Sequence, residues 1–269
     1  MKFSPKKITE NVNISRTSPL KEFVCLLGIL TFTVMCVYFL LGIAIDFVAP
    51  RISSETEKKI ISLYSAIDSQ STNSKEERKK EEIFLQNISD RLFTKSRGVA
   101  VKPKIVFTEK ETVNAFAYPS GEIVFCKGLL TKLNTENEVA FILAHEMGHY
   151  GEKHILKQLG RGTILLFITS GLFGVDNSLN SLIVNFLNTT ERRFSQKQEQ
   201  EADLYAIELL FKSYGHANGA ISSLEKILED KKSSNIKHFF STHPHPGKRI
   251  QKLKQAIKKH KLENTDINF

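Results

Sequence analysis

A long apolar segment near the N-terminus constrains the architecture more than any other feature of this sequence. Phe23–Val48 carries no charged residue until Asp46. At about 1.5 Å per residue, a helix of this length crosses a hydrocarbon core of about 30 Å. The run is longer than the apolar region of a cleaved signal peptide, and no A-x-A pattern follows it. We therefore expect an uncleaved transmembrane anchor at residues 22–48, which contacts membrane lipid.

Lysine and arginine are distributed unevenly around this segment. Those before it are Lys2, Lys6, Lys7, Arg16 and Lys21, and those soon after it are Arg51, Lys58 and Lys59. The flank of a transmembrane helix that is richer in these residues stays in the cytoplasm. The bias predicts a short basic tail at residues 1–21 in the cytoplasm. The bulk of the chain is then expected in an extracytoplasmic, periplasm-like compartment.

The formal net charge of +9 does not indicate a nucleic-acid partner. Basic residues are scattered and interleaved with acids, as in "KEERKKEE" from Lys75, and no platform of basic and aromatic residues is present. We expect no nucleic-acid binding. The three cysteines, Cys25, Cys36 and Cys126, lack the C-x-x-C spacing of a metal site, so free thiols are expected.

The chain after the anchor divides into a helical linker region, residues 50–97, and a main domain, residues 98–269. Apolar residues at helical spacing predict two linker helices, separated by the polar stretch "DSQSTNS" from Asp68. In the main domain, a strand at Lys104–Thr108 and a hairpin of Val113–Tyr118 with Glu122–Cys126 are expected. A basic amphipathic helix is expected from Pro246. The pattern predicts an α+β domain, mostly helical, with a small mixed sheet.

The stretch "HEMGH", His145 to His149, carries the chemistry. Thr135 and Glu138 form a capping-box pattern that starts a helix, and the apolar run "VAFILA" continues it. Two histidines four residues apart on a helix lie on one face and can bind one tetrahedral zinc ion. Glu146 stands beside them, placed to accept a proton from the attacking water. Burying these groups without partners would be costly, which favours a metal site over surface histidines.

A zinc ion needs at least one further protein ligand. His154 lies about half a turn out of phase with His145 on a continuous helix, so we expect it to support the site or the fold and not to bind the metal. Glu199 is the favoured third ligand. It lies on a helix expected at residues 192–210 and begins a stripe that includes small residues, which would let this helix pack closely against another. Asp203, one turn further, can accept the N–H of a ligand histidine. Glu201, on the other face, is the rival ligand.

These motifs together resemble the HtpX-like and CAAX-prenyl-protease-like zinc metallopeptidases, which are membrane-associated gluzincins and include BepA-type enzymes. The resemblance covers about Val99 to Leu253. Its elements occur in the family's order: "NAFAYPSGEIVFCKGLL", "ENEVAFILAHEMGHYGEKH", "FSQKQEQEAD" and "STHPHPGKRI". It implies a zincin-like metallopeptidase domain with one Zn²⁺ ion per chain.

The resemblance also implies residue roles. His145, His149 and Glu199 would bind zinc, Glu146 would be the general base, and Asp203 would support a ligand. Asn114 would lie on an edge strand that binds an extended protein or peptide substrate. Two residues of the late H-P…R element, His243 and Arg249, would lie near the metal, where they would stabilise the oxyanion.

The sequence departs from the family pattern at three places, of which the apolar region between residues 163 and 187 favours the single-anchor, BepA-like branch. Gln196 follows Ser195 where the family often has arginine. The apolar pieces between residues 163 and 187 are too short to span a membrane, so a lid, a re-entrant segment or a core helix is expected there. Only a short tail follows the H-P…R element, so the helical-repeat tail of some BepA-like proteins is not matched.

The expected function is a membrane-anchored zinc endopeptidase that degrades misfolded or membrane-proximal proteins in envelope quality control. The alternative is a membrane-tethered chaperone or assembly factor with a latent or structural zinc site. A structural site would use four protein ligands without a base beside an open position. Glu146 argues against it.

Three interpretations of His243 stay open. It is a surface loop histidine, a donor to the oxyanion, or a zinc ligand of the resting enzyme that keeps the protease inactive, as in BepA-like relatives. A loop residue suits the last role because a short segment can swing away without unfolding the core. His245 is a possible substitute.

Overall fold

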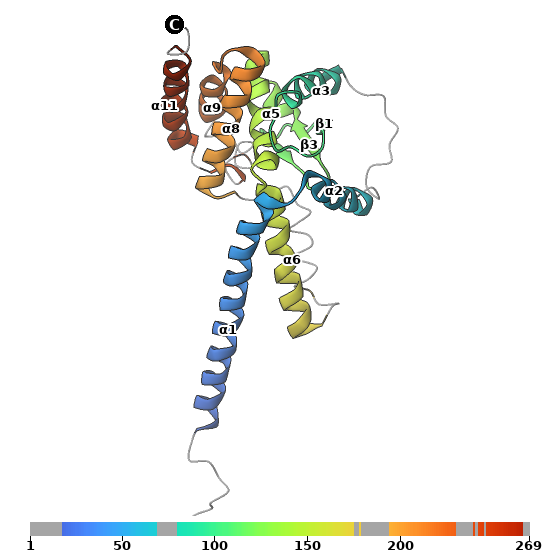
Figure 1. Ribbon diagram of the computed structural model, residues 1–269, viewed down its shortest axis with the longest axis vertical. Coiled ribbons are helices and arrows are strands. Elements are labelled where there is room, and N and C mark those ends of the chain that lie inside the picture. Colours follow the sequence, from blue (N-terminus) through green and yellow to red (C-terminus); the bar gives the residue numbers. More distant parts are fainter. Residues whose placement is uncertain are drawn as a thin grey trace, which may run out of the picture.

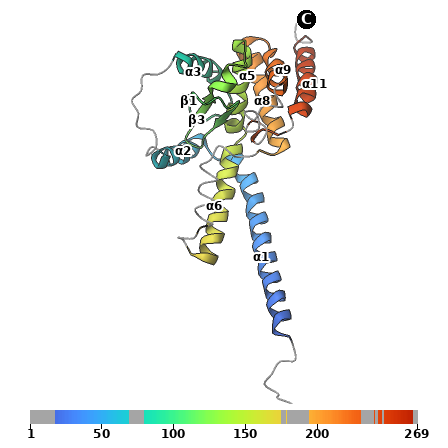
Figure 2. The ribbon, with the colours of Figure 1, turned by 180° about the vertical axis from the view of Figure 1, so that it is seen from behind.

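Two long helices project from a body of packed helices and a small sheet (Figure 1). The computed structural model describes residues 18–68, 80–174, 178, 194–229, 239, 242–244 and 246–265. Figure 1 shows the body at the top with α1 (Pro19–Val48) and α6 (His154–Phe173) extending below it, and Figure 2 shows the same arrangement from behind. Together the two projecting helices form an extension, and the remaining helices and strands form the body.

The body is mostly helical, as the sequence predicts. Its helices pack around one cluster of buried apolar side chains. They are α2 (Ser54–Asp68), α3 (Lys80–Phe93), α4 (Lys127–Leu130), α5 (Glu136–Gly151), α8 (Gln196–Tyr214), α9 (Gly219–Glu229) and α11 (Pro246–Thr265). A short 3-10 turn, η1 (Ala49–Arg51), joins α1 to the body. The two predicted linker helices correspond to α2 and α3.

Three strands form the small mixed sheet that the sequence predicts. β1 (Lys104–Thr108) pairs in parallel with β3 (Glu122–Cys126), and β2 (Ala115–Ala117) pairs with β3 in the antiparallel sense. The order β1-β3-β2 leaves β2 at one edge of the described sheet. Gly121 closes the turn between β2 and β3 with a φ of 87°, a left-handed backbone that favours glycine. The predicted hairpin beside a first strand is therefore confirmed.

Helix α5 runs through the centre of the body. Every side chain from Asn137 to Tyr150 on it is buried. The predicted capping box starts the helix: Thr135 Oγ1 accepts the backbone N–H of Glu138 at 3.2 Å, and Glu138 Oε2 accepts that of Thr135 at 3.2 Å. Because α5 is buried on all sides, its histidines and glutamates lie inside the protein, where they need polar partners.

Helix α8 packs unusually close to α5. A Cβ added to Gly148 would stand 2.9 Å from the Cα of Ala202, so the two backbones meet only because position 148 has no side chain. The predicted stripe on α8 faces inward. Its buried members are Glu199, Ala202, Asp203, Ala206 and Leu210. This contact brings the polar groups of the two helices within reach of one another.

The boundaries of α8 differ from the predicted residues 192–210. The helix begins at Gln196 and ends at Tyr214. Ser195 caps its start: Ser195 Oγ accepts the N–H of Gln198 at 3.3 Å, and Gln198 Oε1 accepts that of Ser195 at 2.9 Å. Gly215 ends it with a φ of 74°. Capping at these two positions fixes the limits that apolar periodicity alone left uncertain.

The region after α5 leaves the body. α6 runs beside the last turns of α1, where Arg161 Nη2 donates to Asp46 Oδ2 at 2.5 Å and Gly160 faces Ile45. The core-helix interpretation of residues 163–187 therefore fails for Thr163–Phe173, which project beyond the core. Residues 175–177 and 179–193 of that region lie outside the described residues. Among the described helices, Pro19–Arg51 alone is long and apolar enough to cross a membrane.

Candidate metal centre

Two histidines of α5 point into one buried space. His145 Nε2 and His149 Nε2 lie 3.2 Å apart, and both side chains are almost fully enclosed. The spacing follows from the helix, since residues four apart lie one above the other on the same face. Two imidazole nitrogens aimed at each other without an intervening partner are poorly satisfied. The pair is therefore suited to share a cation.

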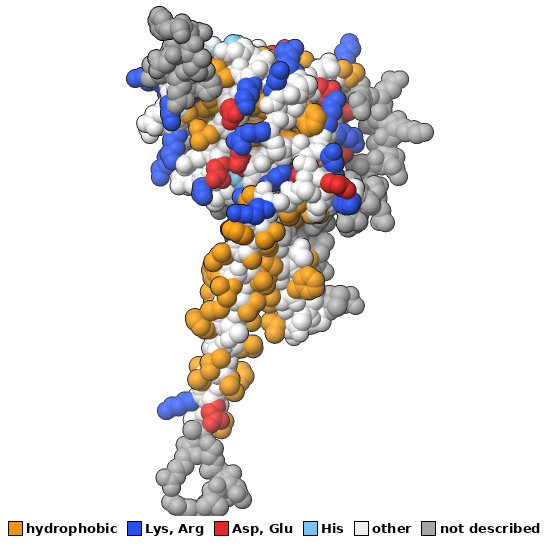
Figure 3. All heavy atoms as spheres, in the orientation of Figure 1, with side chains coloured by type: hydrophobic (Ala, Val, Ile, Leu, Met, Phe, Trp, Pro, Cys, Tyr) orange, Lys and Arg blue, Asp and Glu red, His pale blue; other side chains and the backbone are white. Residues whose placement is uncertain are grey.

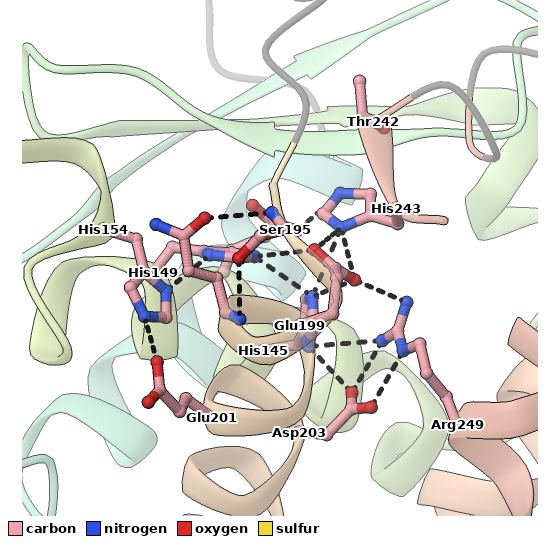
Figure 4. Close-up of polar contacts among 12 residues, drawn as sticks. His145, His149, His154, Ser195, Glu199, Glu201, Asp203, Thr242, His243 and Arg249 are labelled. Carbon is pink, nitrogen blue, oxygen red and sulfur yellow. Dashed lines mark hydrogen bonds and ion pairs between the residues drawn. The ribbon is translucent and has the colours of Figure 1, made fainter. Parts of the chain in front are cut away.

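Helix α8 supplies a carboxylate to the same space (Figure 4). Glu199 is completely buried, and its two oxygens lie 3.6 Å from His145 Nε2 and 3.5 Å from His149 Nε2. The Gly148–Ala202 contact between the two helices makes this approach possible. The structure thus brings together the residues that the sequence singled out on α5 and α8.

His243 completes the cluster from the segment before α11. Its Nδ1 lies 3.1 Å from Glu199 Oε1 and 3.3 Å from His145 Nε2. Its backbone N–H donates to the carbonyl of Phe239 at 2.8 Å, which holds the residue inside the body. The interpretation of His243 as a surface histidine is wrong, because the side chain is buried. His245 lies outside the described residues.

The four donors fit a tetrahedral metal ion. One ligand atom from each of His145, His149, Glu199 and His243 lies within 4.8 Å of all the others. A tetrahedral zinc site with bonds of about 2.0–2.1 Å has edges of about 3.3 Å between donor atoms. The donor atoms of neighbouring pairs in this cluster are separated by 3.1 to 3.6 Å. Nitrogen and carboxylate oxygen donors at these distances match the ligands that zinc prefers.

Glu146 stands beside this cluster without being one of its four members. Its carboxylate is buried, and its Oε1 lies 3.4 Å from His243 Nε2. The Nδ1 atom of His243 therefore faces the cluster, and the Nε2 atom of the same ring faces Glu146. Burial raises the pKa of Glu146, and the neighbouring His243 and His145 oppose this only partly. A carboxylate with a raised pKa is suited to accept and return a proton near neutral pH.

Asp203 and Arg249 form a charged pair behind His145. Asp203 Oδ1 lies 3.0 Å from His145 Nδ1. Arg249, from α11, donates to both oxygens of Asp203, with Nε at 2.8 Å and Nη2 at 2.6 Å. Its Nη1 lies 2.7 Å from Glu199 Oε2 in an ion pair whose angles fall outside those of a hydrogen bond. All three guanidinium nitrogens thus face the carboxylates of α8.

His154 occupies a position that the sequence did not predict. On a continuous helix it would point away from His149, but α5 ends at Gly151 and Lys153 adopts a left-handed backbone with a φ of 61°. The turn redirects the chain, so His154 Nδ1 lies 3.0 Å from His149 Nδ1. Its Nε2 lies 3.0 Å from Glu201 Oε2. Glu201, the rival ligand by sequence, is thus outside the cluster.

One tautomer assignment satisfies both ligand histidines. If His154 donates from Nε2 to Glu201, its Nδ1 accepts from His149, which leaves His149 Nε2 free to bind a metal. Asp203 plays the same part for His145 by accepting from its Nδ1. Burial lowers the pKa of His154 to about 4, although Glu201 opposes this, so the ring stays neutral and can relay the bond. Carboxylates therefore stand behind both histidines.

Phe194 is a neighbour of the centre that sequence reasoning missed. Its ring stacks on that of His149, with centroids 3.6 Å apart and an interplanar angle of 15°. Phe194 directly precedes the cap residue Ser195, where an apolar residue commonly packs back on its own helix. The position before the helix cap could have predicted that Phe194 is packed, but it could not have predicted His149 as the residue it packs against.

Asn114 is not part of the cluster. It is buried just before β2, and its backbone carbonyl accepts the N–H of Cys126 at 3.1 Å. Its side-chain oxygen has no hydrogen-bond partner among the described residues. A buried amide oxygen without a partner at a strand edge is available to a donor from an extended peptide.

Opposing charges set the protonation of the remaining groups. Burial lowers the pKa of His149 well below its ordinary value, so this ring is neutral. Burial and Arg249 act in the same direction on His145, but Asp203 and Glu199 outweigh them and raise its pKa to about 9. Metal binding therefore displaces a proton from His145. For Glu199, His243 and Arg249 overcome the effect of burial and hold the pKa well below the usual range.

Comparison with known proteins relates this geometry to a family. Residues 79–257 match the sequence pattern of the family described as Peptidase family M48. Metalloprotease LoiP of Escherichia coli (strain K12) is 32% identical over 183 residues, covering 64% of this chain and 69% of LoiP. The mitochondrial metalloendopeptidase OMA1 of Arabidopsis thaliana is 29% identical over 155 residues, covering 57% of this chain and 31% of OMA1.

A third relative shows the same pattern of partial coverage. The beta-barrel assembly-enhancing protease of Escherichia coli (strain K12) is 24% identical over 184 residues, covering 62% of this chain and 37% of that protein. The chain thus spans about two thirds of LoiP but well under half of the other two relatives. The range that matches the family, residues 79–257, contains the four-residue cluster.

The relay behind His149 gives a testable prediction. Glu201→Gln replaces a carboxylate acceptor by a weaker amide, so we expect about 10–100-fold weaker metal affinity, measured by competition with a chromogenic chelator. Glu208→Gln is the matched control, because Glu208 lies on the same helix and pairs with Lys212 at 2.6 Å, away from the cluster. Equal affinity of the two variants would show that the His154–Glu201 pair does not orient His149.

Proposed function

The chain belongs to peptidase family M48, and on this basis we propose that it is a membrane-anchored, zinc-dependent endopeptidase. We infer that it degrades misfolded or membrane-proximal proteins in envelope quality control. The observation that supports this most is the buried convergence of four donor atoms within 4.8 Å of one another, with Glu146 beside them. Similarity to the beta-barrel assembly-enhancing protease supports a role in the cell envelope.

In this proposal His145, His149 and Glu199 hold one zinc ion per chain. When bound, the ion supplies Lewis-acid polarisation of the scissile carbonyl and of the attacking water. Asp203 and the His154–Glu201 pair hold the two imidazoles in the tautomer that presents Nε2. Arg249 fixes the carboxylates of Glu199 and Asp203 and prevents their repulsion in the buried site.

Glu146 moves the protons of the reaction. It accepts a proton from the attacking water and returns it to the leaving amine, for which its raised pKa is suited. An extended substrate segment pairs with the edge strand β2 and offers a donor to Asn114. Arg249 stabilises the developing oxyanion by the positive charge of its guanidinium group. A direct role of His243 at the oxyanion is the alternative to the latch proposed next.

We propose that His243 is a latch of the resting enzyme. Its Nδ1 takes the fourth corner of the cluster, and its Nε2 lies against Glu146. In this position the imidazole fills the place of the attacking water and also engages the base. A swing of the short segment around residues 242–244 would free both.

The domain division follows the same proposal. We assign residues 1–21 to a basic tail, 22–48 to the anchor, 50–97 to a helical linker region and 98–269 to the metallopeptidase domain. The lysine and arginine bias supports a cytoplasmic N-terminus and an extracytoplasmic peptidase domain.

The cluster also favours a second candidate function. Four protein ligands close a tetrahedral site, as in structural zinc centres. His243 at the fourth corner would then leave a chaperone or assembly factor with a latent site. The presence of Glu146 beside the cluster distinguishes the two functions experimentally.

We expect Glu146→Gln to lower the rate of casein digestion by the full chain in nanodiscs by about 10²–10⁴-fold, because the base is lost. Zinc content, measured by atomic absorption, should stay at one ion per chain. Glu152→Gln, at the half-buried C-cap of the same helix and paired with Arg97, should digest casein like the wild type. Casein digestion that survives Glu146→Gln would sink the proposed mechanism. Suppression of aggregation without any cleavage product, by wild type and variant alike, would favour the chaperone.

If His243 is a latch, removing this side chain from the cluster should raise the rate of proteolysis. We expect His243→Ala to digest unfolded protein faster than the wild type while it retains zinc through His145, His149 and Glu199. His216→Ala removes an exposed histidine away from the cluster and should leave the rate unchanged. Slower digestion by His243→Ala at unchanged zinc content would exclude the latch and favour the oxyanion role.

The orientation in the membrane is tested by a reporter fused after Phe269. We expect alkaline phosphatase, which is active only outside the cytoplasm, to be active in this position. A cytoplasm-only fluorescent reporter serves as the matched fusion and should stay dark. The opposite pair of signals would place the peptidase domain in the cytoplasm.

A further inference from the structure

Exposed large apolar side chains gather on the two projecting helices. On α6, Phe167 is 76% exposed, Leu172 is 48% exposed and Phe173 is 62% exposed. Outside α1 and α6, the exposed large apolar side chains among the described residues are Ile83, Phe84 and Leu204. Figure 3 shows the apolar surface running down the extension, with Lys and Arg at both of its ends. Such a concentration of apolar surface marks an interaction site.

A collar of charged groups marks the upper limit of this surface. Arg161 on α6 pairs with Asp46 on α1 at 2.5 Å. Arg51 lies over the ring of Phe47, 3.6 Å from its centroid. Arginine and aromatic residues of this kind lie at membrane–water interfaces. The collar places the interface where both helices leave the body.

Below the collar, α6 has the character of a membrane segment. The sequence from Gly162 to Val175 contains no charged residue. Thr163 and Thr169 each donate their hydroxyl to the carbonyl four residues earlier, at 2.9 Å, as Thr31 and Thr33 do on α1 at 2.8 Å. A hydroxyl that donates to its own helix needs no hydrogen bond to water. Polar groups in a hydrocarbon environment must be satisfied within the protein in this way.

The two helices also pack as one unit at the collar. A Cβ on Gly160 would stand 2.8 Å from Ile45 Cδ1, so a larger residue at position 160 would push the Ile45 side chain aside. Small residues at helix contacts are typical of packing in membranes, where backbones approach closely. If α1 enters the bilayer, α6 is therefore drawn in beside it.

We propose that α6 enters the leaflet of the lipid bilayer nearer the body, beside α1, from Gly162 to Phe173. This inference rests on the proposed anchoring by α1. Twelve residues at about 1.5 Å each give about 18 Å, slightly more than half of a hydrocarbon core of about 30 Å. The helix is thus a re-entrant element that reaches about the middle of the bilayer and does not span it.

This placement sets the distance of the metal centre from the membrane. α6 begins at His154, whose ring contacts His149 of the cluster. Arg161 lies seven residues after His154, which corresponds to about 10 Å along the helix. The substrates that fit are polypeptide segments emerging within about that distance of the lipid surface.

Tryptophan provides the probe, because the natural sequence contains none. Phe167→Trp gives the full chain a single tryptophan on the exposed face of α6. Phe39→Trp on α1 is the membrane reference, since Phe39 lies seven residues from Asp46 and Phe167 lies six from Arg161, about 10 and about 9 Å into the bilayer. Leu204→Trp, at a position 54% exposed on the body, is the aqueous reference.

Each variant is placed in phosphatidylcholine nanodiscs with and without brominated acyl chains. We expect Phe167→Trp to match Phe39→Trp, with blue-shifted emission, loss of most intensity to brominated lipid and little quenching by aqueous iodide. Leu204→Trp should show the opposite on all three measures. Phe173→Trp should respond best to bromine near the chain end and Phe167→Trp to bromine nearer the headgroup, because α6 descends from the body.

The outcomes separate this inference from the proposed function. If Phe39→Trp is quenched by brominated lipid and Phe167→Trp behaves like Leu204→Trp, α6 stays in water and the inference is overturned while the anchor stands. Blue-shifted emission of Phe167→Trp without bromine quenching would show that protein, such as a second copy of the chain, covers α6, which also overturns it. If Phe39→Trp itself is not quenched, the anchor fails and the insertion of α6 fails with it.

Discussion

The close contact between α5 and α8 is the constraint on which the rest of the structure depends. His145, His149 and Glu199 converge only because the backbones of the two helices meet at Gly148 and Ala202. This approach buries the two carboxylates of α8 that face α5, Glu199 and Asp203. The stripe of small residues is therefore a geometric requirement of the cluster and not only a packing preference. The capping boxes that start both helices fix which residues arrive at the contact.

Enclosing these charges creates an electrostatic demand that distant segments satisfy. Glu146, Glu199 and Asp203 are buried within one small volume, and repulsion among them would oppose folding. Arg249, on α11, offsets this repulsion because its guanidinium group pairs with two of the three carboxylates. A divalent ion at the cluster would add further positive charge. The last helix of the domain thus stabilises a centre whose other parts lie on α5 and α8.

Local sequence patterns predicted the parts of this centre that depend on helix periodicity. The pairing of His145 with His149, and of Glu199 with Asp203, follows from spacing along single helices. The place of His154 did not, because a left-handed residue at Lys153 breaks the helix, and lysine gives no signal for that conformation. His243 and Arg249 could be suggested only by resemblance, since their contacts span 44 to 104 residues of sequence. The stacking of Phe194 on His149 is a contact of the same long-range kind.

The turn that misled the sequence interpretation also connects the centre to the extension. Because Lys153 redirects the chain, the residue that contacts His149 is the first residue of α6. The same helix carries Arg161 to Asp46 of α1 and then continues below the collar. A rigid helix therefore links the second histidine of the cluster to the proposed membrane surface. Any tilt of α6 relative to the body would move His154 and, through the His154–Glu201 relay, disturb the orientation of His149. With α1 and α6 in the bilayer as proposed, this connection would hold the four-residue cluster at a fixed height above the lipid.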